Sequence, residues 1–455
     1  MKKAFVALMM VALLAACAPS ASTPISTSSL EPTVMLAEES PAASAIPLTE
    51  QPLVVAFAKN GDIHLWDSET QQSRMIVKAG DITTIMMSDD GQLIAFLRRS
   101  SVQLTEPDWY EQYALWAVDR NGENPREIVS AATLRQLLNP STTDSTGFGQ
   151  ISWIPHTHRL VYSGVKYNAA GQGFTNSKDI YLVDADTLSN TVPAPDVMPD
   201  TFLHAWRFVL SPDGQQIALF SGTELSFLNV DGSNWRPAVL TYPYPPVMGD
   251  GVLLPTGVWT QDSRAFVFTG SMPSEPLAGL NYTIWRVPVD GSPAQPLATL
   301  TESHSGSITF SPDGQRMAFF QDINGDGVIQ TEDYRIMPLA VEAGPLAIPY
   351  TSEWGALSNP HWSPAGTAFV IKDREILQLC PDATQISQVC GDPIHMKSDS
   401  NIISSSIQWV DSTRFLFTGL EPSTLSLGNV DGTILPIATW TDDDVLSGWS
   451  FHTPQ

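Results

Sequence analysis

One short phrase recurs along this chain at intervals of roughly fifty residues, a spacing typical of repeated structural units. The two clearest copies read Phe208-Val-Leu-Ser-Pro-Asp-Gly-Gln-Gln-Ile-Ala-Leu-Phe220 and Ile308-Thr-Phe-Ser-Pro-Asp-Gly-Gln-Arg-Met-Ala-Phe-Phe320. Further copies begin at Ile85, Ile151, Gly257, Pro360 and Ile407. Each copy has apolar residues on both sides of a tight turn, which predicts two strands joined by a hairpin.

These repeats predict an all-β protein that forms a single β-propeller. Repeats of this length bury their apolar faces by stacking on their neighbours, and four short strands per repeat is the pattern of a propeller blade. We expect eight four-stranded blades, or seven if one divergent copy is not a blade. Residues 54–57 read as a second strand without a first, and residues 448–454 as a first strand without a second. We therefore expect the C-terminal strand to complete the N-terminal blade and close the ring.

Aligning the copies places one large apolar residue just before each turn. These residues are Met87, Trp153, Leu210, Trp259, Phe310, Trp362 and Trp409. The strand after the turn is apolar on both faces, as in residues 94–96 and 266–268, which is expected of a sheet packed between two others. Because buried aromatic residues usually serve packing, these positions predict core and no chemical role.

The phrase Ser-Pro-Asp-Gly-x-x-Ile-Ala-Phe resembles the WD40-like (PD40) repeat of TolB-like propellers, which also occurs in the propellers of prolyl-oligopeptidase-type enzymes. The resemblance covers roughly residues 52–455. TolB carries a small α/β domain ahead of its propeller, and the peptidases carry an α/β-hydrolase domain after theirs. This sequence shows neither domain, so the resemblance implies the fold and neither of those roles.

The N-terminal residues predict export and lipid anchoring. Lys2 and Lys3 are followed by an apolar run over residues 4–13 and then by Leu14-Ala-Ala-Cys17, the pattern of a secretory signal. The ending resembles a bacterial lipobox, which implies a lipidated Cys17; the alternative is an ordinary secretory signal. Residues 18–50 are rich in Ser, Thr, Pro and Ala, which predicts a disordered tether. We expect a signal peptide over 1–17, this tether, and a propeller over 51–455, anchored to the cell or outer membrane and facing the periplasm or exterior.

Charge and cysteine content narrow the functional classes. The formal net charge is −25, which argues against nucleic acid as a partner because phosphates need a basic surface. Cys380 and Cys390 lie close together in sequence, and in an exported protein this spacing favours a structural disulfide over two free buried thiols. The length fits one large domain, which we expect to be monomeric.

Residues 322–333 match the spacing of a calcium-binding loop. Oxygen-bearing residues fall at positions 1, 3 and 5, glycine at position 6 and a carboxylate at position 12. The predicted ligands are Asp322, Asn324, Asp326, Val328 through its carbonyl, Gln330 and Asp333. The loop resembles those of EF-hand and dockerin modules but lacks the flanking helices, and position 12 is Asp instead of Glu. We expect a structural calcium ion; the alternative is an acidic turn without an ion.

Short turns and long connections are predicted to lie on opposite faces. The Ser-Pro-Asp-Gly turns and the Asp-Gly turns of the third and fourth strands share one face, and long connections occupy the other: residues 99–113, 129–148, 164–178, 241–256 and 270–282. Irregular connections on a rigid scaffold commonly bind ligands. The candidate binding aromatics are Trp109, Tyr110, Tyr167, Phe174, Tyr242 and Tyr244. The alternative is that they pack onto the propeller itself. Residues 134–138 suggest a brief helix.

Catalytic motifs are scarce: neither Gly-x-Ser-x-Gly nor His-Glu-x-x-His occurs. His156 and His158 replace a turn and suggest a metal site only weakly, while His361 with Gln408 is a candidate for the central channel. The sequence therefore favours a lipid-anchored, non-catalytic module that binds a protein or glycan of the cell envelope. The alternatives are a channel-centred polysaccharide lyase or hydrolase and an accessory lipoprotein subunit of an envelope complex.

Overall fold

The computed structural model describes residues 52–453 with internal gaps. The gaps are 104–108, 168–173, 195, 198–205, 222, 243–246, 249–250, 253–254, 273–280, 301–307, 321–333, 340–345, 348–359, 373–375, 381–393, 396–406, 420–422 and 442. The chain divides into two units, Met1–Ala45 and Ile46–Gln455, and every described residue belongs to the second. Across the described residues, no helix is long and apolar enough to cross a membrane.

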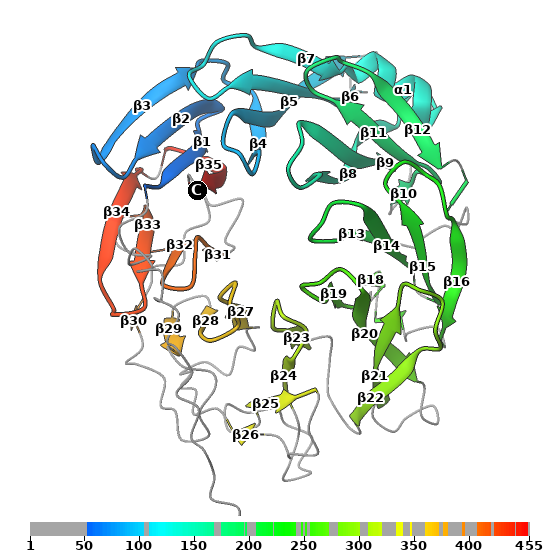
Figure 1. Ribbon diagram of the computed structural model, residues 1–455. Helices are drawn as coiled ribbons and strands as arrows, with labels where there is room; N and C mark the ends of the chain where they lie inside the picture. Colours follow the sequence, from blue (N-terminus) through cyan, green and yellow to red (C-terminus); the bar gives the residue numbers. More distant parts are fainter. Residues whose placement is uncertain are drawn as a thin grey trace, which may run out of the picture. The chain divides into compact units, whose positions relative to one another are not determined.

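The described residues of the second unit form antiparallel sheets that follow one another in chain order (Figure 1). Five four-stranded sheets each use consecutive strands: β13 (Arg207–Leu210), β14 (Gln216–Phe220), β15 (Glu224–Asn229) and β16 (Arg236–Thr241); β19 (Gly257–Trp259), β20 (Ala265–Met272), β21 (Asn281–Pro288) and β22 (Gln295–Leu300); β23 (Thr309–Phe310), β24 (Arg316–Phe320), β25 (Tyr334–Pro338) and β26 (Leu346–Ala347); β27 (Pro360–Trp362), β28 (Phe369–Lys372), β29 (Ile376–Cys380) and β30 (Ile394–His395); β31 (Gln408–Trp409), β32 (Arg414–Thr418), β33 (Thr424–Asn429) and β34 (Ile434–Thr439). Strands β17 (Val247–Met248) and β18 (Gly251–Val252) form a small separate hairpin. This repeated arrangement is the one that the sequence repeats predict.

A sixth four-stranded sheet joins the two ends of the unit. It consists of β3 (Gln72–Val77), β2 (Asp62–Asp67), β1 (Val54–Lys59) and β35 (Leu446–His452), in that order. β35 pairs antiparallel with β1, which confirms the predicted pairing of the C-terminal strand with residues 54–57. Next to this pair, the Asn60 side chain bonds Asp444 and the Val445 amide, at 2.7 and 2.8 Å.

The second and third repeats share one nine-stranded sheet. Its strands are β4 (Ile82–Met87), β5 (Leu93–Gln103), β6 (Trp109–Asp119), β7 (Arg126–Val129), β8 (Ser145–Trp153), β9 (Arg159–Tyr167), β10 (Phe174–Asn176), β11 (Ile180–Asp184) and β12 (Asn190–Ala194). A group of four antiparallel strands, β4–β7, meets a group of five, β8–β12, where β6 and β8 pair in parallel at Gln112 and Thr146. The helix α1 (Ala131–Leu138) lies between the two groups in sequence, where residues 134–138 suggested one.

Buried serines explain why the repeated phrase begins with Ser and continues to Asp-Gly. The Ser211 hydroxyl donates to the Asp213 carboxylate and accepts the amide of Gln216, while the Asp213 carboxylate accepts the amide of Gln215. Gly214 takes a positive φ of 67°, which favours glycine. Ser88 and Ser311 repeat these bonds in their own turns. The phrase is therefore a self-satisfying turn in its side-chain oxygens, and the Asp213 amide links it to the next sheet by donating to the Ser263 hydroxyl at 3.1 Å.

The tryptophans before the turns connect neighbouring sheets through hydrogen bonds. The indole N–H of Trp259 donates to the Val209 carbonyl at 2.9 Å, and that of Trp409 donates to the His361 carbonyl at 2.6 Å. The indole N–H of Trp153 likewise donates to the Met86 carbonyl, and that of Trp362 donates to the Thr309 hydroxyl. In each case the acceptor residue comes directly before the large apolar residue that the alignment places ahead of the turn in the previous repeat. Met87, Trp259, Trp362 and Trp409 are buried, as predicted, whereas Trp153, Leu210 and Phe310 are only partly buried. The indole bonds also connect one repeat to the next.

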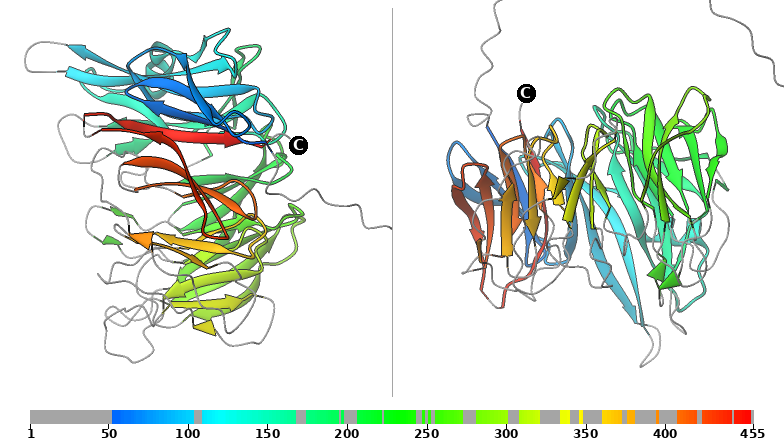
Figure 2. Two further views of the ribbon diagram at one scale, coloured as in Figure 1. Left: turned by 90° about the vertical axis from the view of Figure 1, so that its left-hand side faces the viewer. Right: turned by 90° about the horizontal axis from the view of Figure 1, so that it is seen from below.

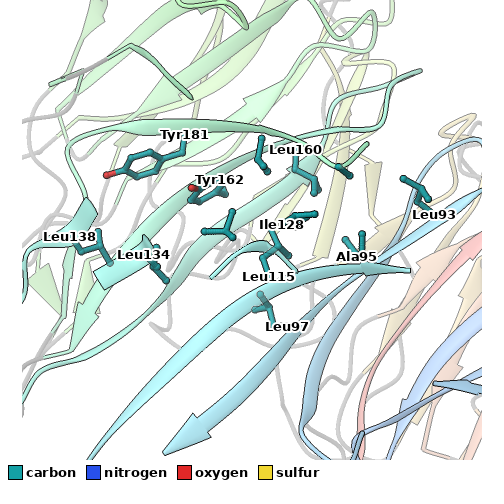
Figure 3. Close-up of a cluster of buried hydrophobic side chains, with 14 residues drawn as sticks. Leu93, Ala95, Leu97, Leu115, Ile128, Leu134, Leu138, Leu160, Tyr162 and Tyr181 are labelled. Carbon is teal, nitrogen blue, oxygen red and sulfur yellow. The ribbon is translucent and has the colours of Figure 1, made fainter. Parts of the chain in front are cut away.

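Apolar clusters fill the space between successive sheets. Figure 3 shows one of them, in which leucines of β5 and β6 meet Leu160, Tyr162 and Tyr181 of the next group of strands. Leu134 and Leu138 of α1 are buried in the same cluster. The helix is bounded by a capping hydroxyl at its start and a left-handed residue at its end. Burial on both faces of the second strands is thus confirmed.

Several predicted long connections are in part regular hairpins. Residues 99–113 were expected to be irregular, yet β5 and β6 stay in register from Leu93–Asp119 to Gln103–Trp109. Figure 2 shows this hairpin extending beyond the other strands, on the side away from the C-terminus. β9–β10 and β20–β21 likewise continue into residues 164–178 and 270–282. Pairing of the strands satisfies the backbone hydrogen-bonding groups of an insertion. The sequence did not predict this pairing, because apolar and polar residues alternate too weakly there.

Candidate functional site

The two edges of the sheets carry different chemistry. The turns between first and second strands and those between third and fourth strands lie together, since the Val230 amide donates to the Gln215 carbonyl and the Val430 amide donates to the Thr413 carbonyl. We call this the turn edge. The opposite edge, which carries the extended β5–β6 and β9–β10 hairpins, is the hairpin edge. The predicted separation of short turns from longer insertions is therefore present.

Two exposed aromatic side chains lie on the hairpin edge. Tyr167, at the end of β9, pairs in register with Phe174, at the start of β10, and their ring centroids are 6.3 Å apart. They are 46% and 40% exposed, respectively. Burial of part of the ring, followed by the nearby Glu111 carboxylate, raises the pKa of Tyr167, so the phenol stays neutral at physiological pH. The pair offers an apolar surface with one polar hydroxyl.

A cavity of about 690 Å³ opens beside this pair and is lined by residues of β8, β9, β10, β13, β14 and the start of β19. Gln150 forms part of its wall and connects two sheets: its side-chain amide donates to the Phe208 carbonyl at 2.7 Å and accepts the Phe208 amide at 3.1 Å. The Ser163 hydroxyl accepts the Gln150 amide at 3.0 Å. These bonds connect β8 to β9 and β13 along the wall of the opening.

Two of the candidate aromatics have structural contacts instead of open faces. Tyr242 is only 8% exposed, its hydroxyl lies within hydrogen-bond distance of the Ser221 and Glu224 carbonyls, and its ring packs on Phe268. Its assignment as a binding residue is wrong, because the residue directly after β16 falls back onto the core. Tyr110 is half-buried, and the guanidinium carbon of Arg135 lies 4.1 Å from its ring centre. Both therefore follow the alternative of packing onto the fold.

Other predicted site residues lie outside the described residues. Trp109 is in β6, but its side chain is not described, and Tyr244 falls in a gap. The whole predicted calcium loop, residues 322–333, lies outside the described residues. Cys17 and Cys390 also lie outside them, in other parts of the chain. Cys380 is disulfide-bonded, and its pairing with Cys390 stays a prediction. Among the described residues, no group of three or more His, Cys, Asp or Glu side chains is arranged to hold a metal.

His158 connects two groups of strands on the turn edge. Its Nδ1 lies 2.7 Å from a carboxylate oxygen of Asp186, and its Nε2 lies 2.9 Å from one of Asp90. Asp186 also pairs with Arg126, at 3.3 Å. His158, Asp90, Asp186 and His156 border a cavity of about 700 Å³. Both ring nitrogens can donate only when the imidazole is protonated, so this arrangement favours the imidazolium.

The charges around His158 shift its titration. Partial burial lowers the pKa of His158, but hydrogen bonds to Asp186 and Asp90 and the charges of these carboxylates outweigh it, and the pKa lies above the ordinary 6.5. For Asp90, burial raises the pKa, whereas bonds from Ser88, the Gln92 amide and His158 lower it, with a net decrease. The two residues thus stabilise each other's charged forms.

The channel candidates have backbone contacts in the structure. His361 lies in β27, where its carbonyl accepts the Trp409 indole N–H. The Gln408 side-chain amide lies 3.5 Å from the Trp449 carbonyl. These contacts belong to the packing of neighbouring sheets.

Sequence reasoning missed the polar residues of the hairpin-edge cavity. Gln150, Asn176 and Arg207 come from three strands and carry no shared motif. The one available signal was position: Gln150 lies in a first strand, and Arg207 starts the next one. A sequence does not show which side chains of successive sheets point into one opening.

No protein-family model matches the chain, and no curated protein matches it. Solved structures similar to it include a eukaryotic initiation factor (10% identity, 88% of this chain and 98% of that chain, TM-score 0.49). Others are the β-propeller domain of the trilobed protease from Pyrococcus furiosus (10%, 80% and 99%, 0.44) and oligogalacturonate lyase from Vibrio parahaemolyticus (14%, 68% and 79%, 0.43). These likenesses are too distant to transfer a role. The repeated four-stranded antiparallel sheets themselves support a β-propeller fold.

Proposed function

We propose that this protein is a non-catalytic binding module of the cell envelope, exported and tethered to a membrane by lipid on Cys17. The propeller would have eight blades, with β35 completing the blade of β1–β3. This count takes the nine-stranded sheet as two blades that touch at one parallel pair. Residues 18–50 would hold the propeller away from the lipid surface.

The observation that carries the binding role is the exposed Tyr167–Phe174 pair at the mouth of the hairpin-edge cavity. Aromatic side chains are costly to leave in water and are enriched where ligands bind. Here they lie on a regular hairpin, so little conformational freedom is lost on binding. Concave, preformed openings with a few polar groups are the usual form of ligand sites. A glycan or a protein segment of the envelope would bind across this pair.

The test is a double variant, Tyr167→Ala with Phe174→Ala, in the full mature chain. We expect it to lose about tenfold or more in affinity for envelope glycans or proteins captured by the wild type. The matched control is Met75→Ala, which removes another exposed apolar side chain from the outer strand β3 and should bind normally. Equal binding by the double variant and the wild type would refute the proposal.

We further propose a structural calcium ion bound by residues 322–333, supported by the spacing of the oxygen ligands. A ligand that binds only the folded state raises its stability, so calcium should raise the melting temperature of the wild type. Asp326→Ala should abolish that rise, whereas the control Asp231→Ala, in an ordinary Asp-Gly turn, should keep it. A rise that persists in Asp326→Ala would remove the assignment.

A further inference from the structure

The hairpin-edge cavity differs from other openings in the sign of its charge. Three other cavities in the described residues each include carboxylates: Glu69 and Asp431 in one, Asp262 and Asp313 in another, and three aspartates in the cavity beside His158. The hairpin-edge cavity has no Asp or Glu among its described lining residues, and it includes Arg207. The chain has 48 acidic and only 23 basic residues. A cavity lining that includes an arginine and no described carboxylate is therefore unusual for this composition.

Arg207 is available to a ligand. It is exposed at the start of β13, and within the described residues its guanidinium has no ion pair or hydrogen bond. Five other arginines form ion pairs within the described residues, for example Arg98 with Asp81 and Arg414 with Asp411. A guanidinium binds a carboxylate through two parallel hydrogen bonds. Among the described lining residues of the cavity, no carboxylate competes with a ligand for Arg207.

The neutral lining residues complete the recognition chemistry. The Asn176 side chain lines the same cavity and, within the described part of the chain, has no hydrogen-bond partner. Its amide can both donate and accept, as paired sugar hydroxyls require. Tyr167 and Phe174 present ring faces at the cavity mouth, and the apolar face of a pyranose ring packs on such faces. Cation, amide and aromatic rings thus converge on one opening.

We propose that this cavity binds an acidic glycan, with the carboxylate of a uronic acid residue on Arg207 and its sugar ring on the Tyr167–Phe174 pair. The proposal rests on the proposed binding function and specifies its ligand class. A neutral sugar would leave the guanidinium without an anionic partner. A sulfate ester would present similar oxygens, and the test therefore separates the two anions.

The experiment measures binding of the full mature protein to uronate oligosaccharides by calorimetry. The probes are oligoglucuronate, oligogalacturonate and oligomannuronate, each beside its carboxyl-reduced form, and a sulfated neutral oligosaccharide. The variants are Arg207→Gln, the Tyr167/Phe174 double alanine, and Arg74→Gln as a control. Arg74 is an exposed arginine of β3, away from the cavity lining. Arg74→Gln removes one positive charge, as Arg207→Gln does, so the two variants have the same net charge. Unfolding midpoints of all variants establish that each is folded.

The expected result is binding of at least one uronate oligosaccharide, loss of about tenfold or more on carboxyl reduction, and a similar loss in Arg207→Gln. Arg74→Gln should bind as the wild type does. Equal affinity for acid and reduced forms, with loss only in the double alanine variant, would overturn the acidic ligand and leave the binding function standing. Preference for the sulfated probe would overturn the carboxylate assignment. Binding to none of the probes, together with unchanged envelope capture by the double alanine variant, would overturn both proposals.

Discussion

The turn edge and the hairpin edge are built from the same strands but use their polar groups differently. On the turn edge, serine, aspartate and backbone groups bond one another within each turn, and His158 joins Asp90 to Asp186 across two turns. On the hairpin edge, Tyr167, Phe174 and Arg207 project beside an open cavity. The first edge has its interactions inside the chain, whereas the second offers groups that a ligand can complete.

This difference shows how one repeated unit supports both stability and binding. A short turn that satisfies its own side-chain oxygens can be repeated in every sheet, and its contacts with the neighbouring sheet add to stability. An extended hairpin changes which side chains reach the surface and leaves the sheet beneath it intact. We therefore expect changes at the turn edge to act mainly on stability and changes at the hairpin edge to act mainly on binding.

The largest effect on stability is expected at Gly232. A Cβ there would overlap the Pro193 carbonyl of the preceding sheet, whereas a Cβ on Gly291, in the equivalent turn, would meet nothing within 4 Å. Both glycines have φ near +85°, at 84° and 89°. Gly291→Ala should cost about 1–2 kcal/mol from backbone strain alone, and Gly232→Ala a further ~1–3 kcal/mol from overpacking. Urea unfolding compares the two, and equal midpoints would show that the turn edge does not pack between sheets.

A smaller loss is expected for Ser211→Ala. Ser211 is fully buried and its hydroxyl bonds both Asp213 and the Gln216 amide. Its removal leaves a partly buried amide without this acceptor, at a cost of about 1–2 kcal/mol. Ser292→Ala, in an exposed turn, should change stability by less than about 0.5 kcal/mol. Thermal unfolding of both variants measures the difference. A harmless Ser211→Ala would mean that these turns are not self-satisfying.

The smallest effect depends on pH. Because the pKa of His158 is raised in the folded state, its contribution is fully present below the unfolded-state value of about 6.5 and is lost as pH rises through the folded-state value. Wild type should exceed His158→Gln by about 0.5–1 kcal/mol at pH 5 and by less at pH 9. The advantage should shrink in 1 M salt. A difference that grows with pH would contradict the protonated bridge between Asp90 and Asp186.

Much of the fold follows from local sequence. Three features were predictable from the sequence: the Ser-Pro-Asp-Gly turns, the apolar second strands and the pairing of the terminal strand. The first two depend on a few adjacent residues, and the third follows from the incomplete repeats at the two ends of the repeat series. The extension of β5–β6 was not, because residues 99–113 lack clear alternation. The parallel pairing of β6 with β8 at Gln112 and Thr146 was also not predictable, because it depends on how the insertion between these two strands folds.

The candidate site was only partly predictable. Tyr167 and Phe174 were found because exposed aromatics in insertions are conspicuous. Tyr242 has the same residue type in a similar place, but contacts with distant carbonyls bury it. Arg207 belongs to no motif, because its importance depends on the absence of carboxylates from the described residues that three-dimensional packing brings around it. Composition cannot show such a local reversal of charge.

The pairing of β35 with β1 has a consequence for the time course of synthesis. The Asn60 side chain bonds an amide 385 positions later in the chain, so the first sheet stays incomplete until the last described strand has been made. A nascent or truncated chain would expose the edge of β1, which is a hazard for aggregation. Only a chain that includes β35 can cover that edge, so the first sheet depends on a strand that is made hundreds of residues later.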